Sequence, residues 1–219
     1  FLDPEQALKY STNPWYDIRY AEILLNYAEA VVESGKVKVG NELSQSFRFV
    51  PNDEECTFTL HDVVIGVNFH WQRKENQSFR GELLLIVENG MVRAINRVGV
   101  EEYLVSVISS EMSATSSLEF LKAHTVISRS WLYAQLLRKE KVQQGSQGWE
   151  NSDEIVRWYA REDHTLFDLC ADDHCQRYQG VTRAVNPNVA RAVRETCDIV
   201  LMYDGEVCDA RFSKCCGGV

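Results

Sequence analysis

The feature that most constrains the fold of this chain is a pair of consecutive helical patterns between residues 101 and 140. The first pattern, Glu101–Met112, places its apolar residues at helical spacing, which gives one apolar face. These residues are Tyr103, Leu104, Val107, Ile108 and Met112. The second pattern runs from Ser117 to about Glu140. The sequence therefore predicts a helix, a tight turn and a second helix, with the carboxylate of Glu111 at the end of a mostly buried helix.

The start of the second helix and its charged face are also predictable. Ser116 and Glu119 have the spacing of a capping box, in which each side chain binds the other residue's backbone amide. Lys122 and Arg129 are separated by seven residues and so share one helix face. A carboxylate beside such cations is more often part of a structural ion pair than of a catalytic site. Both interpretations of Glu111 stay open on these residues alone.

Composition restricts the class of protein. The 219 residues are 45% hydrophobic and 25% charged, which is typical of a globular chain with one large or two small cores. The net charge of −9 argues against nucleic acid as a partner, because binding phosphates requires a basic surface. No apolar run reaches the roughly 18 residues that a membrane span needs, so no membrane span is predicted.

Residues 1–35 differ from the rest of the chain. Asn13-Pro14 can begin a helix, an apolar stripe follows, and Gly35 can end it. The run Trp15–Ala30 resembles a helix of SusD-like outer-membrane glycan-binding proteins. A single helix of this kind cannot form a glycan-binding surface, because repeat helices bury their faces against neighbours. Residues 1–35 are therefore interpreted as an N-terminal amphipathic helix, either a SusD-like fragment or an appendage.

Residues 37–98 show the short apolar or alternating runs of β-strands. The clearest turn is Asn89-Gly90, which separates Leu83–Val87 from Met91–Ile95 and predicts a hairpin. We expect an α+β fold, in which an antiparallel sheet or small barrel packs against the helix pair.

The C-terminal part is expected to contain a polar surface loop and two strands. The loop is Lys141–Ser152, and the strands are Asp198–Tyr203 and Glu206–Phe212, joined by Asp204-Gly205.

Two histidines and two cysteines lie close together in the sequence: His164, Cys170, His174 and Cys175. Two imidazoles and two thiolates form a ligand set for tetrahedral zinc. The spacing is not that of a common zinc finger. Solvent-exposed His and Cys residues, or a Cys170–Cys175 disulfide, remain alternatives by composition.

Several motifs together resemble one family. Glu101–Ala134 resembles the signature helix pair of the stage II sporulation protein D family (SpoIID/LytB domain). Later motifs follow in the family's order: Cys175-Gln176-x-Tyr178-x-Gly180, Glu195-Thr196, Tyr203-Asp204-Gly205 and Phe212-Ser213-x-x-Cys216-Gly217-Gly218. The resemblance implies a SpoIID-like domain over residues 37–219. Family members usually continue beyond the Cys-Gly-Gly motif, so a C-terminally truncated domain is expected.

The resemblance implies a lytic transglycosylase that cleaves the MurNAc–GlcNAc bonds of peptidoglycan glycan strands, acting after a cell-wall amidase partner has removed the stem peptides. Glu111 matches the general acid/base, and Lys122, Arg129 and Tyr178 match residues assigned to the substrate. One carboxylate is sufficient for this reaction, whereas a hydrolase needs two. We expect Lys122 and Arg129 to serve the substrate rather than pair with Glu111.

The resemblance also implies that His164, Cys170, His174 and Cys175 bind Zn²⁺. Its role would be structural, because four protein ligands leave no open position for water. The expected location is the cell envelope, periplasmic or extracellular, with no leader in this sequence.

The sequence departs from the family in the turn Ser113–Ser116, where tryptophan and proline are usual, and at His124, where glutamine is usual. Both departures bear on substrate preference.

Two other functions are compatible with these residues. The first is a non-catalytic glycan-binding or amidase-enhancing module of the same family. The second is SusD-like glycan capture, suggested by residues 1–35.

Overall fold

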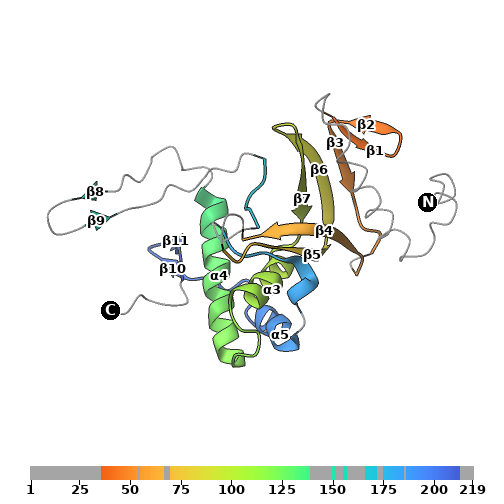
Figure 1. Ribbon diagram of the computed structural model, residues 1–219. Helices are drawn as coiled ribbons and strands as arrows, with labels where there is room; N and C mark the ends of the chain where they lie inside the picture. The colour runs from red at the N-terminus through yellow and green to blue at the C-terminus, as the bar shows by residue number, and fades with distance from the viewer. Residues whose placement is uncertain are drawn as a thin grey trace. The chain divides into compact units, whose positions relative to one another are not determined.

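The computed structural model describes residues 36–53, 55–66, 70–138, 149–150, 155–156, 166–171, 175–184 and 186–212. The chain divides into two compact units. The first comprises Phe1–Ser106 with Gln179–Val185, and the second comprises Val107–Tyr178 with Asn186–Val219. The predicted α+β class is confirmed (Figure 1). The predicted helix in residues 1–35 and nearly all of the predicted loop 141–152 lie outside the described residues.

The first unit consists mainly of antiparallel strands, labelled in Figure 1. They are β1 (Val37–Val39), β2 (Glu42–Ser44), β3 (Ser46–Phe49), β4 (Thr57–Ile65), β5 (Arg73–Arg80), β6 (Glu82–Glu88) and β7 (Met91–Arg97). β1 pairs with β2, β4 pairs with β5, and β6 lies between β3 and β7. A 3-10 helix, η1 (Gly180–Arg183), belongs to the same unit.

The predicted hairpin is confirmed. Glu88 pairs with Met91, so the turn consists of Asn89 and Gly90 alone. Both turn residues have positive φ, 50° and 76°, which is the backbone that the Asn-Gly pair adopts readily in two-residue hairpins. Leu83 and Leu85 of β6 are buried at alternate positions and supply the core of this sheet.

The predicted alternative of a small barrel is wrong, because the described strands form separate small sheets. Gly81, at φ 82°, is the single residue between β5 and β6, and these consecutive strands belong to different sheets. The β4–β5 ladder is also interrupted by a register shift between Leu60 and Val63. A bulge of this kind bends a strand and increases its twist.

The second unit contains the predicted helix pair. α3 (Val100–Glu111) runs from the first unit into the second, and α4 (Leu118–Arg138) follows after a short turn. The predicted capping box between Ser116 and Glu119 is wrong, and a single serine cap takes its place one residue later. The Ser117 hydroxyl, rather than that of Ser116, accepts a hydrogen bond of 3.4 Å from the amide of Phe120. Glu119 instead pairs with Lys122.

A third helix, α5 (Pro187–Glu195), packs against α4 (Figure 1). It was not predicted, although Asn186 caps it and Pro187 opens it, which is a recognisable start signal. The shared core is apolar and contains Val107, Ile108, Leu121, Leu132, Ala134, Val189, Ala192 and Val193.

The predicted C-terminal strands form, but they are shorter than expected. β10 (Met202–Tyr203) and β11 (Glu206–Val207) make a small hairpin beside α4. A second short pair is β8 (Trp149–Glu150) with β9 (Ile155–Val156).

No helix in the described part of the chain combines the length and apolarity required to cross a bilayer.

Candidate active site

Glu111 is the last residue of α3 and is half-buried. Its Oε1 atom accepts a hydrogen bond of 2.8 Å from the backbone amide of Arg177, which lies 66 residues further along the chain. None of the ion pairs among the described residues includes Glu111. The carboxylate is therefore oriented by a neutral donor, and its charge is not neutralised by a lysine or arginine of this region.

The segment that carries this amide is itself anchored to the second unit. Gln176 is buried, and its Nε2 atom donates to the carbonyl oxygen of Ser128 on α4 at 3.2 Å. The Tyr178 amide donates to the carbonyl of Ala171 at 3.2 Å. Arg177 lies between these two anchors, so its amide is held in place on both sides.

The turn after Glu111 is fastened to the start of α5. The Asn186 side chain donates from Nδ2 to the carbonyl of Ala114 at 2.5 Å, and its Oδ1 atom accepts from the amide of Asn188 at 2.9 Å. One side chain thus caps α5 and holds the turn beside Glu111. The exposed hydroxyls of Ser113 and Thr115 are 2.8 Å apart in this turn.

Lys122 joins α4 to α5. Its Nζ atom is 2.7 Å from Oε2 of Glu195 and 3.0 Å from Oε1 of Glu119. The hydrogen bond from Lys122, followed by that from Arg191, lowers the pKa of Glu195 to about 2. The hydrogen bond to Glu195, followed by that to Glu119, raises the pKa of Lys122. In this structure the Lys122 ammonium forms ion pairs with both Glu119 and Glu195. A substrate role for Lys122 stays a prediction.

Arg129 is fully buried at the C-terminal end of α5. Its Nη1 atom donates to the carbonyl of Ile199 at 3.1 Å and lies 3.4 Å from the hydroxyl of Thr196, while Nη2 donates to the carbonyl of Val193 at 3.3 Å. The guanidinium thus binds one carbonyl in the last turn of α5 and one in the chain that follows this helix. A direct substrate contact through Arg129 stays a prediction, and it would require α5 to move.

The other predicted site residues are only partly described. Tyr178 is buried, and its substrate role stays a prediction. Cys170 and Cys175 are half-buried, whereas His164 and His174 lie outside the described residues. The bond between Tyr178 and Ala171 brings together the two chain segments that carry the cysteines.

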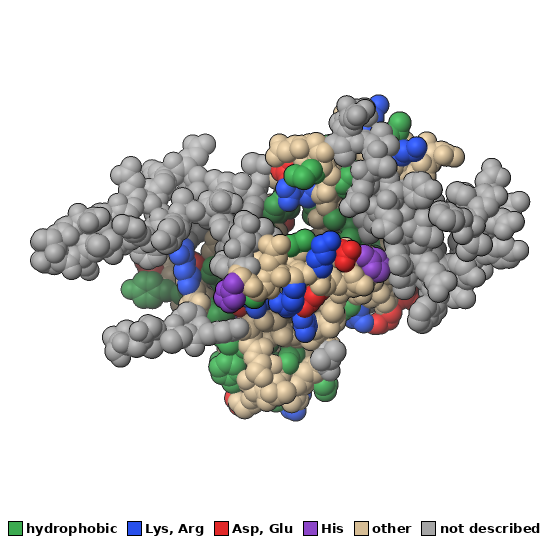
Figure 2. All heavy atoms as spheres, viewed as in Figure 1, with side chains coloured by type: hydrophobic (Ala, Val, Ile, Leu, Met, Phe, Trp, Pro, Cys, Tyr) green, Lys and Arg blue, Asp and Glu red, His purple; other side chains and the backbone are tan. Residues whose placement is uncertain are grey.

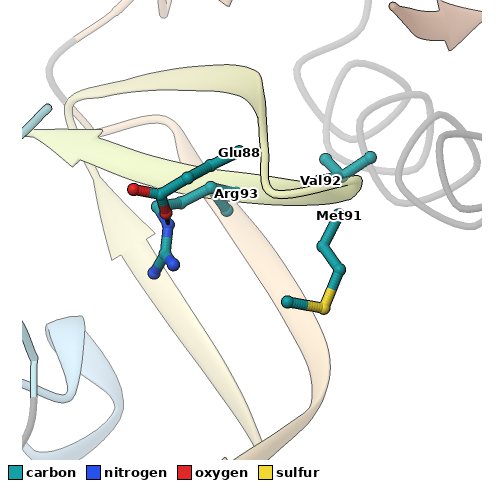
Figure 3. A pocket seen from close by; sticks show the side chains of 5 residues that line it. Glu88, Met91, Val92 and Arg93 are labelled. Atoms are coloured by element: carbon teal, nitrogen blue, oxygen red, sulfur yellow. Dashed lines mark ion pairs between the residues drawn. The ribbon is translucent and has the colours of Figure 1, made fainter. Parts of the chain in front are cut away.

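A shallow surface depression lies elsewhere, on the β6–β7 hairpin, and is lined by Glu88, Met91, Val92, Arg93 and Ala94 (Figure 3). Glu88 and Arg93 form an ion pair across the hairpin. None of the predicted site residues lines this depression. On the face shown in Figure 2, basic and acidic side chains lie next to one another.

The Arg177 amide and the Asn186 side chain were not predicted from the sequence. Gln176 was visible as part of the Cys-Gln-x-Tyr motif, but its anchoring role was not predicted. Backbone amides carry no sequence signal, because every residue other than proline has one.

Comparison with known proteins supports the family assignment. Residues 88–203 match the family described as SpoIID, Stage II sporulation protein. Residues 4–44 match the SusD family. An uncharacterised protein of Brachyspira hyodysenteriae is 24% identical over 215 residues, covering 98% of this chain and 47% of that protein. The chain thus spans about half the length of this relative. No solved structure matches. Because the SpoIID match covers more than half of the residues, the chain belongs to the SpoIID family of stage II sporulation proteins.

Proposed function

We propose that this chain carries the catalytic domain of a lytic transglycosylase that cleaves MurNAc–GlcNAc bonds in peptidoglycan glycan strands. The observation that carries the proposal is a single half-buried carboxylate, Glu111, oriented by a backbone amide and without an ion pair to Lys122 or Arg129. Membership of a family associated with cell-wall lytic activity supports the same reaction class.

A single carboxylate is sufficient if the sugar supplies its own nucleophile. Glu111 donates its proton to the glycosidic oxygen as the bond from C1 of MurNAc to that oxygen breaks. The 6-hydroxyl oxygen of the same MurNAc then bonds to C1, and its proton passes to Glu111. The products are a 1,6-anhydro sugar and a new 4-hydroxyl, and the glutamic acid is regenerated. The Arg177 amide holds one carboxylate oxygen, which leaves the other available for the substrate.

The test is release of saccharides that end in 1,6-anhydro-MurNAc from purified, peptide-free glycan strands. Glu111→Gln removes the transferable proton, and we expect a fall of about 100-fold or more, the usual scale of general acid–base catalysis. Glu119→Gln is the matched control, because Glu119 is an exposed glutamate that pairs with Lys122. Equal release by wild type and Glu111→Gln would refute the proposal. Glycan binding without turnover in wild type would favour a non-catalytic or amidase-enhancing module.

We also propose a structural zinc ion held by His164, Cys170, His174 and Cys175. The hydrogen bond between Tyr178 and Ala171 supports it, since it brings together the two segments that carry the soft thiolate ligands Cys170 and Cys175. Bound zinc would fix these segments, and so help to hold the Arg177 amide against Glu111. Metal analysis of wild type beside the Cys170→Ser/Cys175→Ser variant tests the site. A metal-free wild type purified without chelators would refute it.

The proposed partners are peptidoglycan glycan strands and a cell-wall amidase that prepares them. The proposed location is the cell envelope, on the periplasmic or extracellular side, where such strands are found.

A further inference from the structure

We propose that Asn186 is a positioning residue for catalysis. Its side chain fastens the turn that follows Glu111 to the start of α5, and so fixes the direction in which the carboxylate points. This inference rests on the proposed function and deepens it, because it gives a role in the reaction to a residue outside the family motifs. Asn186 acts through Glu111 and not through a contact with the substrate.

The first argument is the place of Glu111 as the last residue of α3. The final carbonyl groups of a helix have no intrahelical partners, so the backbone at a helix end is held less firmly than the helix interior. The turn after Glu111 has a hydrogen bond of its own, from the amide of Ser116 to the carbonyl of Ser113 at 3.0 Å. This bond joins two residues within the turn, so it does not tie the turn to the rest of the protein.

The second argument is that two distant bonds hold the two parts of Glu111. The Arg177 amide donates to the carboxylate at 2.8 Å. The backbone beyond Glu111 is held by Asn186, whose Nδ2 atom donates to the carbonyl of Ala114 at 2.5 Å in a part-buried contact. Both donors belong to the second unit, as Glu111 does. A movement of the turn would shift the end of α3 relative to the Arg177 amide and break the bond that orients the carboxylate.

The third argument is the choice of residue. A side-chain amide has a donor and an acceptor on one group. The Oδ1 atom of Asn186 caps α5 by accepting from the Asn188 amide, which leaves Nδ2 to bind Ala114. Aspartate and serine cap helices about as well as asparagine. Aspartate has no donor, and the serine hydroxyl is one bond shorter, so neither performs both tasks. Substitution can therefore separate the cap from the bond to the turn.

The experiment compares Asn186→Asp and Asn186→Ser with wild type, because both variants keep a cap for α5 and lose the bond to Ala114. We expect kcat on peptide-free glycan strands to fall about tenfold, since misplacing a catalytic group by about 1 Å can cost about 100-fold and the shift here is smaller. KM should stay within about twofold of wild type, because no substrate contact is removed.

Asn186→Ala loses the cap as well as the bond. It should therefore show the lowest midpoint of urea unfolding, while its kcat should fall by the same factor as in the two capped variants. Circular dichroism shows that each variant is folded at the assay temperature. A merely structural role would lower the unfolding midpoint and leave the kcat of the folded protein unchanged.

A second measurement does not depend on turnover. Hydrogen exchange of the Arg177 amide, followed by NMR, should become about tenfold faster in both capped variants, because the amide loses its fixed partner when Glu111 shifts. Asn188→Asp is the control. It places a negative charge on an exposed side chain of α5 and keeps the backbone amide that Asn186 caps, so kcat and exchange should both stay unchanged.

An unchanged kcat in the folded Asn186 variants would overturn the proposal. A lower kcat with unchanged exchange of the Arg177 amide would also overturn it, because the effect would then not pass through Glu111. Equal losses in Asn188→Asp would assign the effect to charge and refute the role of Asn186. If wild type shows no turnover, the proposed function fails, and the exchange of the Arg177 amide alone decides whether Asn186 positions Glu111.

Discussion

Gly180 is a position at which the backbone conformation and the packing against β5 both require glycine. It follows Tyr178 and Gln179, opens η1, and has a φ of 60°. A Cβ atom at this position would lie 2.1 Å from the carbonyl oxygen of Ser78 on β5. Glycine is therefore required both by the backbone conformation and by the close approach of β5.

Replacing Gly180 by alanine should destabilise the first unit by about 2–4 kcal/mol, the sum of left-handed strain and a backbone clash. Gly205→Ala is the matched control, because Gly205 has a φ of 77° and a Cβ atom there would have no neighbouring atom within 4 Å. Its expected cost is about 1–2 kcal/mol, from strain alone. Urea unfolding measures both variants. Equal losses would show that the contact with Ser78 has no cost.

His124 is a second residue with a physical consequence. It is 4% exposed, and its ring packs edge-on against Phe212 with centroids 4.6 Å apart. Its Nε2 atom is buried without a hydrogen-bond partner among the described residues. Burial disfavours the charged imidazolium and lowers the pKa of His124 to about 4.

Stability should therefore fall as the pH decreases from about 6.5 towards 4, because the unfolded chain takes up a proton at His124 that the folded chain excludes. The upper limit of this loss is about 3 kcal/mol. His124→Gln, which places glutamine at the position where the family usually has it, should remove the dependence. The measurement is urea unfolding of both proteins at pH 7 and pH 4.5. Parallel losses in the two proteins would contradict the assignment.

At the scale of elements, α4 organises the second unit by binding three separate segments. Ser128 accepts from Gln176, Ser130 accepts from the amide of Leu201 at 2.8 Å, and Gln135 donates to Asp209 at 3.2 Å. Arg129 adds the end of α5 to this set. The backbone carbonyl of Ser128 therefore holds the segment that supplies the Arg177 amide, while side chains of α4 hold the segments around Leu201 and Asp209.

Removing Arg129 should be the costliest of the α4 substitutions. Arg129→Met leaves the carbonyls of Val193 and Ile199 without their donor, and we expect a loss of about 2–4 kcal/mol. Lys122→Met should cost less, because the Lys122 side chain is 25% exposed and its ion pairs are accessible to solvent. Thermal unfolding of the two variants ranks them. A larger loss for Lys122→Met would show that the ion pairs, not the buried guanidinium, hold α5.

Among the elements that were not predicted, β5 and α5 were missed for different reasons. β5 is largely polar, with Phe79 as its one large apolar residue, so it shows no alternating hydrophobic pattern. It is a strand because its backbone pairs with β4 over most of its length. α5 did carry a local signal in Asn186-Pro187, but its amphipathic stripe is only nine residues long. Short helices depend on tertiary packing for their stability.

At the scale of the whole molecule, the SusD-like match covers residues 4–44, while β1 begins only at Val37. Val37 and Val39 are buried and belong to the first unit. The segment before residue 36 can therefore be removed without deleting a described strand.

A chain comprising residues 36–219 should bind glycan strands as tightly as the longer chain, because Glu111 lies in the second unit. Pull-down with insoluble peptidoglycan compares the two chains. If the shorter chain folds, as judged by circular dichroism, but no longer binds, glycan capture by the SusD-like segment would be favoured over the proposed site.

The helix pair, the Asn-Gly hairpin, the α+β class and the place of Glu111 at a helix end could all be predicted from the sequence. These features follow from local periodicity and turn chemistry, which depend on residues close together in the chain. Three contacts became visible only in the folded chain: the Arg177 amide binds Glu111, Lys122 binds Glu195, and Arg129 binds the end of α5. Each of these contacts joins residues more than 60 positions apart, with separations of 66 for Glu111 and 64 for Arg129. Such contacts depend on how the elements pack, because a charged side chain has the same local pattern whether it binds substrate or protein.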